Sequence, residues 1–463
     1  MAIATTERLR NYLGAFSAFR ARAERQPAWL RDLRERAFVR FCEAGFPTTK
    51  DEDWRFTNLN ALAQTPFELA TCDARGVAAY AGALEPFRIP GAACQLIFVN
   101  GRFVPGLSDF GKLPQGVHVG SLAQAIAEDS NVLETNLGRY LNIERDAFCA
   151  LNTAFLEDGA YVYLPRRTVL EAPICLLFVS IPGDAPQMAH PRNLIVAEDE
   201  TEASVVEDYI SFGSGIFFSN VATELVAGES AVISHHMVER EDQQAFNIST
   251  LRMQQARGAN VSSHSVLLGG GLVRNNVHPV LAGEGGECLI NGLFIGTGSQ
   301  HMDNYMLVEH ASPHCSSRQF YNGILDGHAH GVFHGRIIVH KDAQKTDAKQ
   351  TNRNLLLSDD AQIDTKPQLE IYADDVKCTH GATIGQVEEN ALFYMRTRGI
   401  DEASARRLLL LAFANECLDR MKCRQVRKYL VGVVQRWLPE VFASARATAA
   451  GAGEVERRWE EVG

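Results

Sequence analysis

The sequence has 463 residues, 46% of them apolar and 22% charged, which is ordinary for a folded protein with a sizeable core and, by length, about three domains. Its 45 basic and 56 acidic residues give a net charge of −11, so neither a nucleic acid nor an anionic membrane is expected as a partner. The ten cysteines include no C-x-x-C pair, the N-terminal residues match no secretory signal, and no apolar run could span a bilayer, so we expect reduced thiols in a cytoplasmic protein.

The first third of the chain carries helical spacing and one hairpin signal. Between residues 5 and 44, apolar residues recur mostly three or four positions apart, which predicts a pair of helices. Asn100-Gly101 separates two strand-like runs and favours a tight β-hairpin. Further helices are predicted around residues 121–128 and 131–156. We therefore expect residues 1–155 to form a mainly helical region with a small hairpin.

One stretch in this region resembles a phosphate-binding loop but fails in detail. Gly106–Leu113 reads GLSDFGKL, in which Leu113 replaces the Ser or Thr that would hold magnesium. Pro114 follows and disfavours a helix start at the required place, so the helix N-terminus that should carry the phosphates cannot form. We expect this chain to bind no nucleotide.

From about Tyr161 onward the pattern changes to short alternating runs separated by small or acidic turns. The turns recur about thirty residues apart, a period typical of stacked β-coils. They contain Glu198, Gly228, Gly258 and Glu284. A β-sandwich is the alternative, but these turns lack the Asn-Gly or Asp-Gly pairs that antiparallel hairpins prefer. The sequence thus predicts a mainly β protein with a solenoid core over residues 156–398.

Helical spacing returns after Gly399. Asp401 can cap a helix whose apolar stripe includes Leu408, Leu411 and Phe413, and a second helix follows. The many basic residues between these positions indicate a solvated face or a docking face for a partner. We expect residues 399–463 to form a C-terminal helical segment.

Two residues near the end of the predicted solenoid are candidates for metal chemistry. On a strand, Cys378 and His380 share one face because side chains alternate with period two. A thiolate and an imidazole side by side can bind a transition metal, although a lone cysteine is often only a small core hydrophobe. The roles of His328, His330 and His334 stay open between metal binding and structure. The spacings give no closed tetrahedral zinc set.

A long run around these residues resembles a known family. The run from Asp342 to Gly385, DAQKTDAKQTNRNLLLSDDAQIDTKPQLEIYADDVKCTHGATIG, and LFYMRTRGI at Leu392–Ile400 closely resemble the SufB/SufD family of iron–sulfur cluster assembly proteins. DEDWRFT at Asp51–Thr57 and the stretch from His310 to Phe333 add to the likeness. His380-Gly381-Ala382 looks more like SufD, because SufB-like chains tend to carry an acidic residue in place of Gly381.

The resemblance implies a fold, a complex and a site. The fold is a right-handed parallel β-helix flanked by α-helical N- and C-terminal segments. The function is that of a non-catalytic scaffold subunit in an ATP-driven SufBCD complex, with a SufB-like paralogue bound through the β-helix core and a SufC-like ATPase on the C-terminal helices. An iron–sulfur cluster would be held transiently and shared with SufB, with Cys378 and His380 as candidate ligands and His380 favoured for iron. A homodimer is possible for the isolated chain.

Two alternatives remain. The chain could be the SufB-like cluster scaffold itself. It could also be a β-helix enzyme acting on polysaccharide, for which Asp374-Asp375 and Lys377 are the densest charged candidates.

Overall fold

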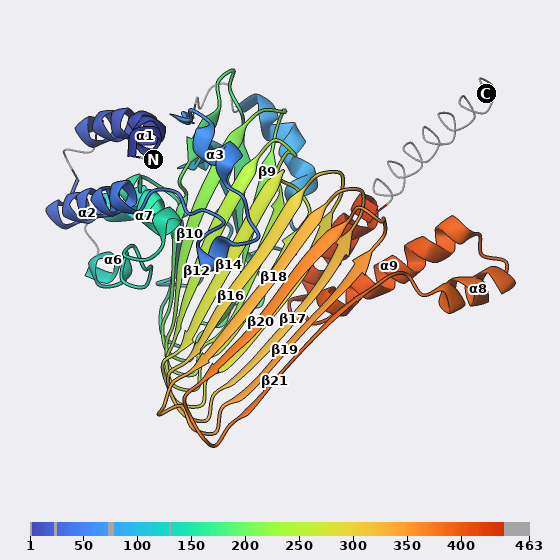
Figure 1. The fold of residues 1–463 in the computed structure, drawn as a ribbon. Coiled ribbons are helices and arrows are strands. Elements are labelled where there is room, and N and C mark those ends of the chain that lie inside the picture. The colour runs from blue at the N-terminus through green and yellow to red at the C-terminus, as the bar shows by residue number, and fades with distance from the viewer. Residues whose placement is uncertain (1, 23–25, 73–77, 129–130, 439–463) are drawn as a thin grey trace, which may run out of the picture.

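The chain folds into a two-sheet β-solenoid of about eight turns with helices at both ends (Figure 1). The computed structural model describes residues 2–22, 26–72, 78–128 and 131–438. The predicted mainly β fold with helical ends is confirmed, and the β-sandwich alternative is wrong. Within the described residues no helix is long and apolar enough to cross a membrane.

In chain order, helices and short strands are mixed up to residue 154, strands follow up to residue 385, and helices return from residue 389. The helices and helical turns are α1 (Ala2–Arg22), α2 (Ala28–Ala44), η1 (Glu52–Trp54), α3 (Asn60–Gln64), η2 (Ala78–Phe87), η3 (Pro105–Leu107), α5 (Leu122–Ala127), α6 (Asn131–Asn136), α7 (Ala147–Ala154), α8 (Glu389–Thr397) and α9 (Glu402–Leu418), with a last helical stretch at 424–438. The strands are β1 (Glu68–Leu69), β2 (Cys94–Val99), β3 (Arg102–Phe103), β4 (His118–Ser121), β5 (Ala160–Leu164), β6 (Ile174–Ser180), β7 (Gln187–Ala189), β8 (Arg192–Ala197), β9 (Glu202–Ser211), β10 (Phe217–Ala227), β11 (Val232–Arg240), β12 (Phe246–Gln255), β13 (Asn260–Leu267), β14 (Leu272–Leu281), β15 (Glu287–Gly296), β16 (His301–His310), β17 (Ser316–Leu325), β18 (His330–Val339), β19 (Asp347–Leu356), β20 (Gln362–Ile371) and β21 (Lys377–Gly385).

Successive strands of the solenoid alternate between its two sheets. Sheet A runs in the order β20-β18-β16-β14-β12-β10-β8-β5-β4, and sheet B in the order β21-β19-β17-β15-β13-β11-β9-β6-β2-β3. From β5 to β21 the coils pair in parallel, with partner residues from 26 positions apart (Phe246 beside Leu272) to 33 apart (Tyr161 beside Leu194). This offset is the thirty-residue rhythm that the turns of the sequence predict.

One corner of the solenoid repeats the same backbone conformation in coil after coil. The residues with positive φ at this corner are Arg167, Glu200, Ser230, Gly258, Gly285, His314 and Lys345, with φ between 56° and 71°. Backbone hydrogen bonds join neighbouring corners: Glu200 N–H donates to the Glu229 carbonyl, and Gly258 N–H donates to the Glu284 carbonyl. The left-handed residue is what lets the chain turn tightly at this corner and pass to the other sheet.

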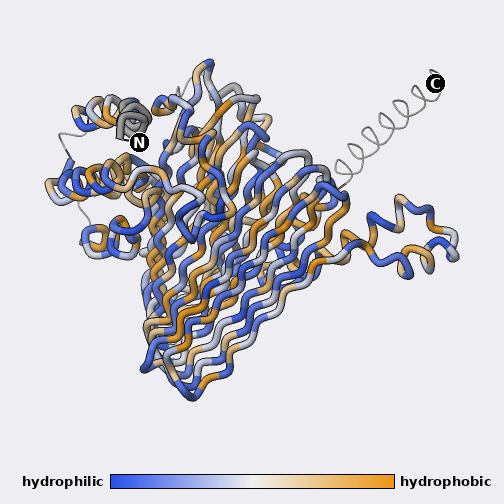
Figure 2. Tube along the Cα trace, in the orientation of Figure 1, coloured by the Kyte–Doolittle hydropathy of each residue, from blue (hydrophilic) through white to orange (hydrophobic). Residues whose placement is uncertain are grey.

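The space between the two sheets is filled by apolar side chains that alternate with outward-facing ones. Figure 2 shows hydrophobic and hydrophilic positions alternating along the strands. The narrow interior has room for a large aromatic ring only where the neighbouring coil carries a glycine. The Tyr321 ring packs over Gly292, and the Phe294 ring packs over Gly323. Both rings are fully buried in the same apolar cluster. Small and large residues on adjacent coils therefore share one layer.

The helical segments cover the outer faces of the sheets. Phe16, Phe38 and Phe155 from the N-terminal region pack together against residues of sheet A. Figure 1 shows α1, α2 and α7 together beside β10 and β12. The predicted helical pair and the hairpin of β2 and β3 are confirmed, with Asn100 and Gly101 at φ 51° and 78°. The helix predicted over residues 131–156 is divided into α6 and α7 by a loop.

The C-terminal helices lie on the outer face of sheet B. Asp401 caps α9 as predicted, because its side chain accepts a hydrogen bond from Ser404 N–H at 3.0 Å. Leu410 and Phe413 are buried against the sheet, whereas Leu408, predicted in the same stripe, is 48% exposed. Residues 439–463 of the predicted C-terminal segment lie outside the described residues.

The close approach of Tyr321 to Gly292 gives a stability prediction. A Cβ at position 292 would lie 2.1 Å from the Tyr321 ring, so Gly292→Ala must displace a fully buried ring. We expect the free energy of unfolding to fall by about 1–3 kcal/mol, the usual cost of overpacking a core. Thermal and urea unfolding would measure it. Gly381→Ala on β21, whose Cβ meets nothing within 4 Å, is the matched control; equal stability of both variants would contradict the packing described.

Candidate functional site

The candidate residues Cys378 and His380 lie on β21, the last strand of sheet B. In the parallel register Cys378 stands beside Ala348, and His380 beside Gln350, both on β19. In the described part of the chain no strand pairs with the other edge of β21. The two side chains thus occupy the open end of the solenoid, about 7 Å apart along the strand at the usual rise per residue.

Cys378 faces the interior of the solenoid and is half-buried against its apolar core. Burial raises the pKa of its thiol, and nearby Asp347 raises it further, although the Ala348 backbone acts in the opposite direction. The thiol is therefore mainly protonated at neutral pH. A metal that binds here must displace this proton, which makes binding at this sulfur pH-dependent.

His380 shares the face of Cys378 and is exposed, because no further coil covers it in the described residues. Its neighbour Gln350 is buried and donates from Nε2 to Oε1 of Gln319, at 2.9 Å, in the coil below. Oε1 of Gln350 has no hydrogen-bond partner among the described residues. His380 thus sits at the end of a buried amide row, with its imidazole free to meet a group from outside the chain.

The other candidate histidines lie elsewhere. His330 and His334 are on β18 of sheet A, where His330 Nε2 lies 2.8 Å from Asp364 Oδ2 and His334 Nε2 lies 2.7 Å from Gln368 Oε1. His328 is in the preceding turn, with its side chain 75% exposed. Because β18 and β21 belong to different sheets, the fold does not bring these histidines to Cys378 and His380.

The site as it stands cannot enclose a metal ion. Among the residues that the structure describes, no group of three or more His, Cys, Asp or Glu side chains could hold one. Iron–sulfur clusters and tetrahedral metals take about four protein ligands. Cys378 and His380 can supply at most two of them, so a metal bound here would need further ligands from outside the described residues.

A charged residue in the corner before β21 makes contacts with the preceding coil. Asp375 forms an ion pair with Lys345, and its N–H donates to Gln344 Oε1 at 2.9 Å. These contacts tie the last corner of the solenoid to the coil before it. The Asp374-Asp375 pair considered for polysaccharide chemistry therefore has one carboxylate already committed to a structural contact.

Two groups of exposed apolar side chains were not predicted from the sequence. At the open end, Tyr372 and Ile384 are 63% and 55% exposed. On α8, Phe393 and Tyr394 are 69% and 59% exposed, and Figure 1 shows this helix projecting away from the solenoid. Pro367 within β20 could have indicated an edge strand, because proline is tolerated in sheets mainly at edges.

Comparison with known proteins adds independent findings. The family model described as the SufBD core domain of SUF system FeS cluster assembly matches residues 179–413, and the SufBD protein N-terminal region matches residues 6–176. An iron-sulfur cluster assembly SufBD family protein of Synechocystis is 35% identical over 384 residues, covering 81% of this chain and 84% of that protein. The iron-sulfur cluster assembly proteins SufD of Escherichia coli and Bacillus subtilis are 29% and 26% identical, covering 85% and 92% of this chain and 90% and 97% of their own lengths.

The raised pKa of Cys378 gives a prediction for thiol reactivity. Only the thiolate reacts with iodoacetamide, so at pH 7 we expect Cys378 to be alkylated more slowly in the folded chain than in urea. The rate should rise about tenfold per pH unit while the pH is below the pKa. Peptide mass spectrometry would follow it. Asp347→Asn removes one contribution that raises the pKa and should speed the reaction; a folded chain that reacts faster than the unfolded one would contradict this.

Proposed function

Since the chain belongs to the SufBD family of iron–sulfur cluster assembly proteins, we propose that it is a non-catalytic, SufD-like scaffold subunit of an ATP-driven SufBCD complex. The family and its SufD relatives support a role in cluster assembly. The observation that carries the finer proposal is the position of Cys378 and His380 on the end strand of the solenoid, whose outer edge pairs with no strand among the described residues. In this proposal the nascent cluster is the cargo, held between two subunits.

The partner in this proposal is a SufB-like paralogue that covers the open end. β20 and β21 end their sheets in the described residues, with ten and nine residues each. Long free edges with exposed Tyr372 and Ile384 are an aggregation hazard unless another chain pairs with them. Strand pairing across this end would bring the partner's residues directly to Cys378 and His380.

The chemistry of the shared site follows from the two side chains. The imidazole of His380 can bind iron through a ring nitrogen, whereas the thiol of Cys378, whose pKa is raised by burial, must lose a proton first. His380 is exposed and Cys378 is half-buried, so an iron ion arriving at the open end meets His380 first. We assign iron binding chiefly to His380, with Cys378 and cysteines of the paralogue completing the site.

The C-terminal helices are the proposed docking surface for a SufC-like ATPase. Asn291 Nδ2 and Asn322 Nδ2 donate to the carbonyls of Cys417 and Phe413, at 2.9 and 2.8 Å, and thereby fix α9 to sheet B. α8 presents Phe393 and Tyr394 beyond this anchored helix. An ATPase bound there could pass its motion through α9 to the sheet that carries β21.

A SufB-like role is the second candidate, and β21 argues against it. SufB-like chains are expected to carry an acidic residue at the position of Gly381, directly after His380. A Cβ at this position would meet nothing within 4 Å, so packing would allow an acidic side chain that this chain nevertheless lacks. The glycine is therefore not required by packing. Reconstitution separates the roles: a SufB-like chain would hold a cluster alone, and a SufD-like chain would need its partner.

Removal of the His380 imidazole tests the proposed iron site. In a complex of this chain with its SufB-like and SufC-like partners, we expect His380→Ala to reduce cluster-bound iron and sulfide on the order of tenfold or more, as loss of a ligand or its support does. Iron and sulfide per complex would be measured after size-exclusion chromatography. His328→Ala, in an exposed turn, is the control. Full cluster content in an intact His380→Ala complex would exclude the assigned role.

A charge at the open end tests the proposed interface. We expect Ile384→Asp to weaken binding of the SufB-like paralogue at least tenfold, about 1.4 kcal/mol, because a carboxylate would be buried there without a partner. The SufC-like ATPase should still bind through α8 and α9. Val169→Asp, at a 59% exposed valine between β5 and β6, is the matched control. Co-purification with each partner would measure both effects; unchanged binding of the paralogue would refute this interface.

A further inference from the structure

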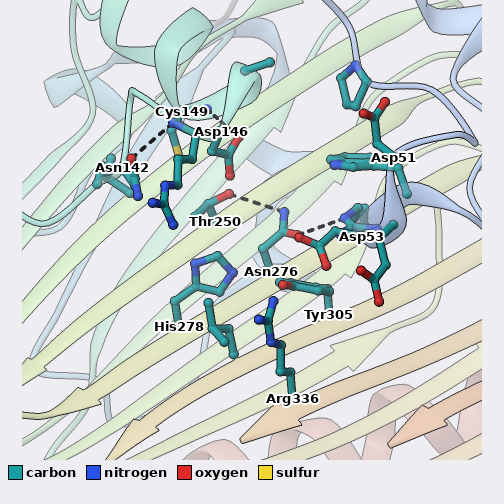
Figure 3. A pocket seen from close by; sticks show the side chains of 18 of the residues that line it. Asp51, Asp53, Asn142, Asp146, Cys149, Thr250, Asn276, His278, Tyr305 and Arg336 are labelled. Atoms are coloured by element: carbon teal, nitrogen blue, oxygen red, sulfur yellow. Dashed lines mark hydrogen bonds between the residues drawn. The ribbon is translucent and has the colours of Figure 1, made fainter. Parts of the chain in front are cut away.

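A large cavity lies on the outer face of sheet A, away from β21. Its volume is about 760 Å³, within the usual range for small-molecule sites. The floor is formed by β12, β14, β16 and β18, and the walls by the loops at residues 44–54 and 141–149 (Figure 3). The proposed cluster site on sheet B does not use this cavity.

Parallel register builds the floor from residues far apart in sequence. Arg252 on β12 stands beside His278 on β14, and Leu307 on β16 stands beside Arg336 on β18. All four line the cavity. Each coil thus adds one residue to a row that crosses the floor, and three of these four residues carry nitrogen donors.

Two buried nitrogen atoms on this floor lack partners. Nε of Arg252 and Nε2 of His278 are buried and have no hydrogen-bond partner among the described residues. Glu309 lies 3.4 Å from two nitrogens of Arg252, Nη1 and Nη2, and leaves Nε unpaired. Burial lowers the pKa of His278 to about 3, so its ring is neutral at pH 7. An unsatisfied buried donor costs about 1–3 kcal/mol, which an acceptor from a ligand would recover.

Most lining carboxylates already have donors of their own. Asp51 accepts from Thr48 N–H at 2.7 Å, and Asp146 accepts from Phe148 N–H at 2.9 Å. Glu52 pairs with Lys366 on β20 at 2.8 Å. The hydrogen bond to Glu370 raises the pKa of Arg336, and Asp53 nearby raises it further. Arg252 Nε and His278 Nε2 are therefore left without acceptors, whereas most carboxylates of the walls already have donors beside them.

We propose that this cavity binds a small organic anion whose carboxylate or phosphate oxygens accept hydrogen bonds from Arg252 Nε and His278 Nε2. A guanidinium is the usual partner of both anions, and neutral His278 acts as a second donor through its Nε2 tautomer. Arg336, whose Nε donates to Glu370 at 2.6 Å, lies further along the same row and adds positive charge to this floor. The site goes beyond the proposed scaffold role, which needs no ligand here.

The loop that walls the cavity would couple a ligand to the rest of the chain. Trp54 in this loop lies under the Arg274 guanidinium, 3.8 Å from the ring centroid, and Glu52 reaches Lys366 on the end strand β20. A ligand held between this loop and sheet A would bridge the N-terminal region and the solenoid. We therefore expect binding to raise the unfolding temperature.

Anion titration tests the proposal. Inorganic phosphate and citrate would be added to the full chain at constant ionic strength, maintained with chloride, and followed by calorimetry and thermal unfolding. We expect at least one of them to bind and to raise the unfolding temperature, and the better of the two identifies phosphate or carboxylate as the preferred group. Arg252→Met should weaken this binding at least tenfold. Arg257→Met, at an arginine whose side chain is 70% exposed in the turn after β12, should bind like the wild type.

His278→Leu is a second variant in case Arg252→Met does not fold, and it should weaken binding in the same direction. The proposal is overturned if neither anion binds the wild-type chain, or if the folded variants at positions 252 and 278 bind as the wild type does. Association with the SufB-like paralogue is measured in parallel and should not change in these variants, which separates a failure of this site from a failure of the scaffold role.

Discussion

The structure depends on in-register parallel hydrogen bonding between successive coils. Each coil satisfies the backbone groups of the coil before it and exposes a new row of its own, so a solenoid always leaves one row unpaired at its end. Among the residues that the structure describes, that row lies on β20 and β21. The edge is therefore not incidental to the fold, and it is the same edge that presents Cys378 and His380.

The same register, and not distance along the sequence, decides which side chains become neighbours. His334 and His380 lie within one histidine-rich stretch, but alternation between sheets sends them to different faces. Arg252 and His278 are in separate coils, and stacking makes them neighbours on one floor. Sites in this fold thus consist either of residues two apart on one strand or of residues one coil apart.

The sequence predicted what is local or periodic. The turn rhythm gave the solenoid, Asn100-Gly101 the hairpin, and the period-two spacing of Cys378 and His380 their shared face. It could not predict which surfaces become covered: Leu408 fits the helical stripe but faces outward, because the position of α9 on sheet B decides burial. The cavity at Arg252 was equally out of reach, since it needs the offset of every coil between β12 and β18.

The central claim is that the open end of this solenoid is one half of a site completed by a paralogue, with His380 as an iron ligand. The most direct test is electron–nuclear double resonance on an assembled complex in which only this chain carries nitrogen-15-labelled histidine. The account predicts a nitrogen coupling to the paramagnetic cluster that disappears in His380→Ala. A cluster in the complex with no coupling to any histidine of this chain would contradict it.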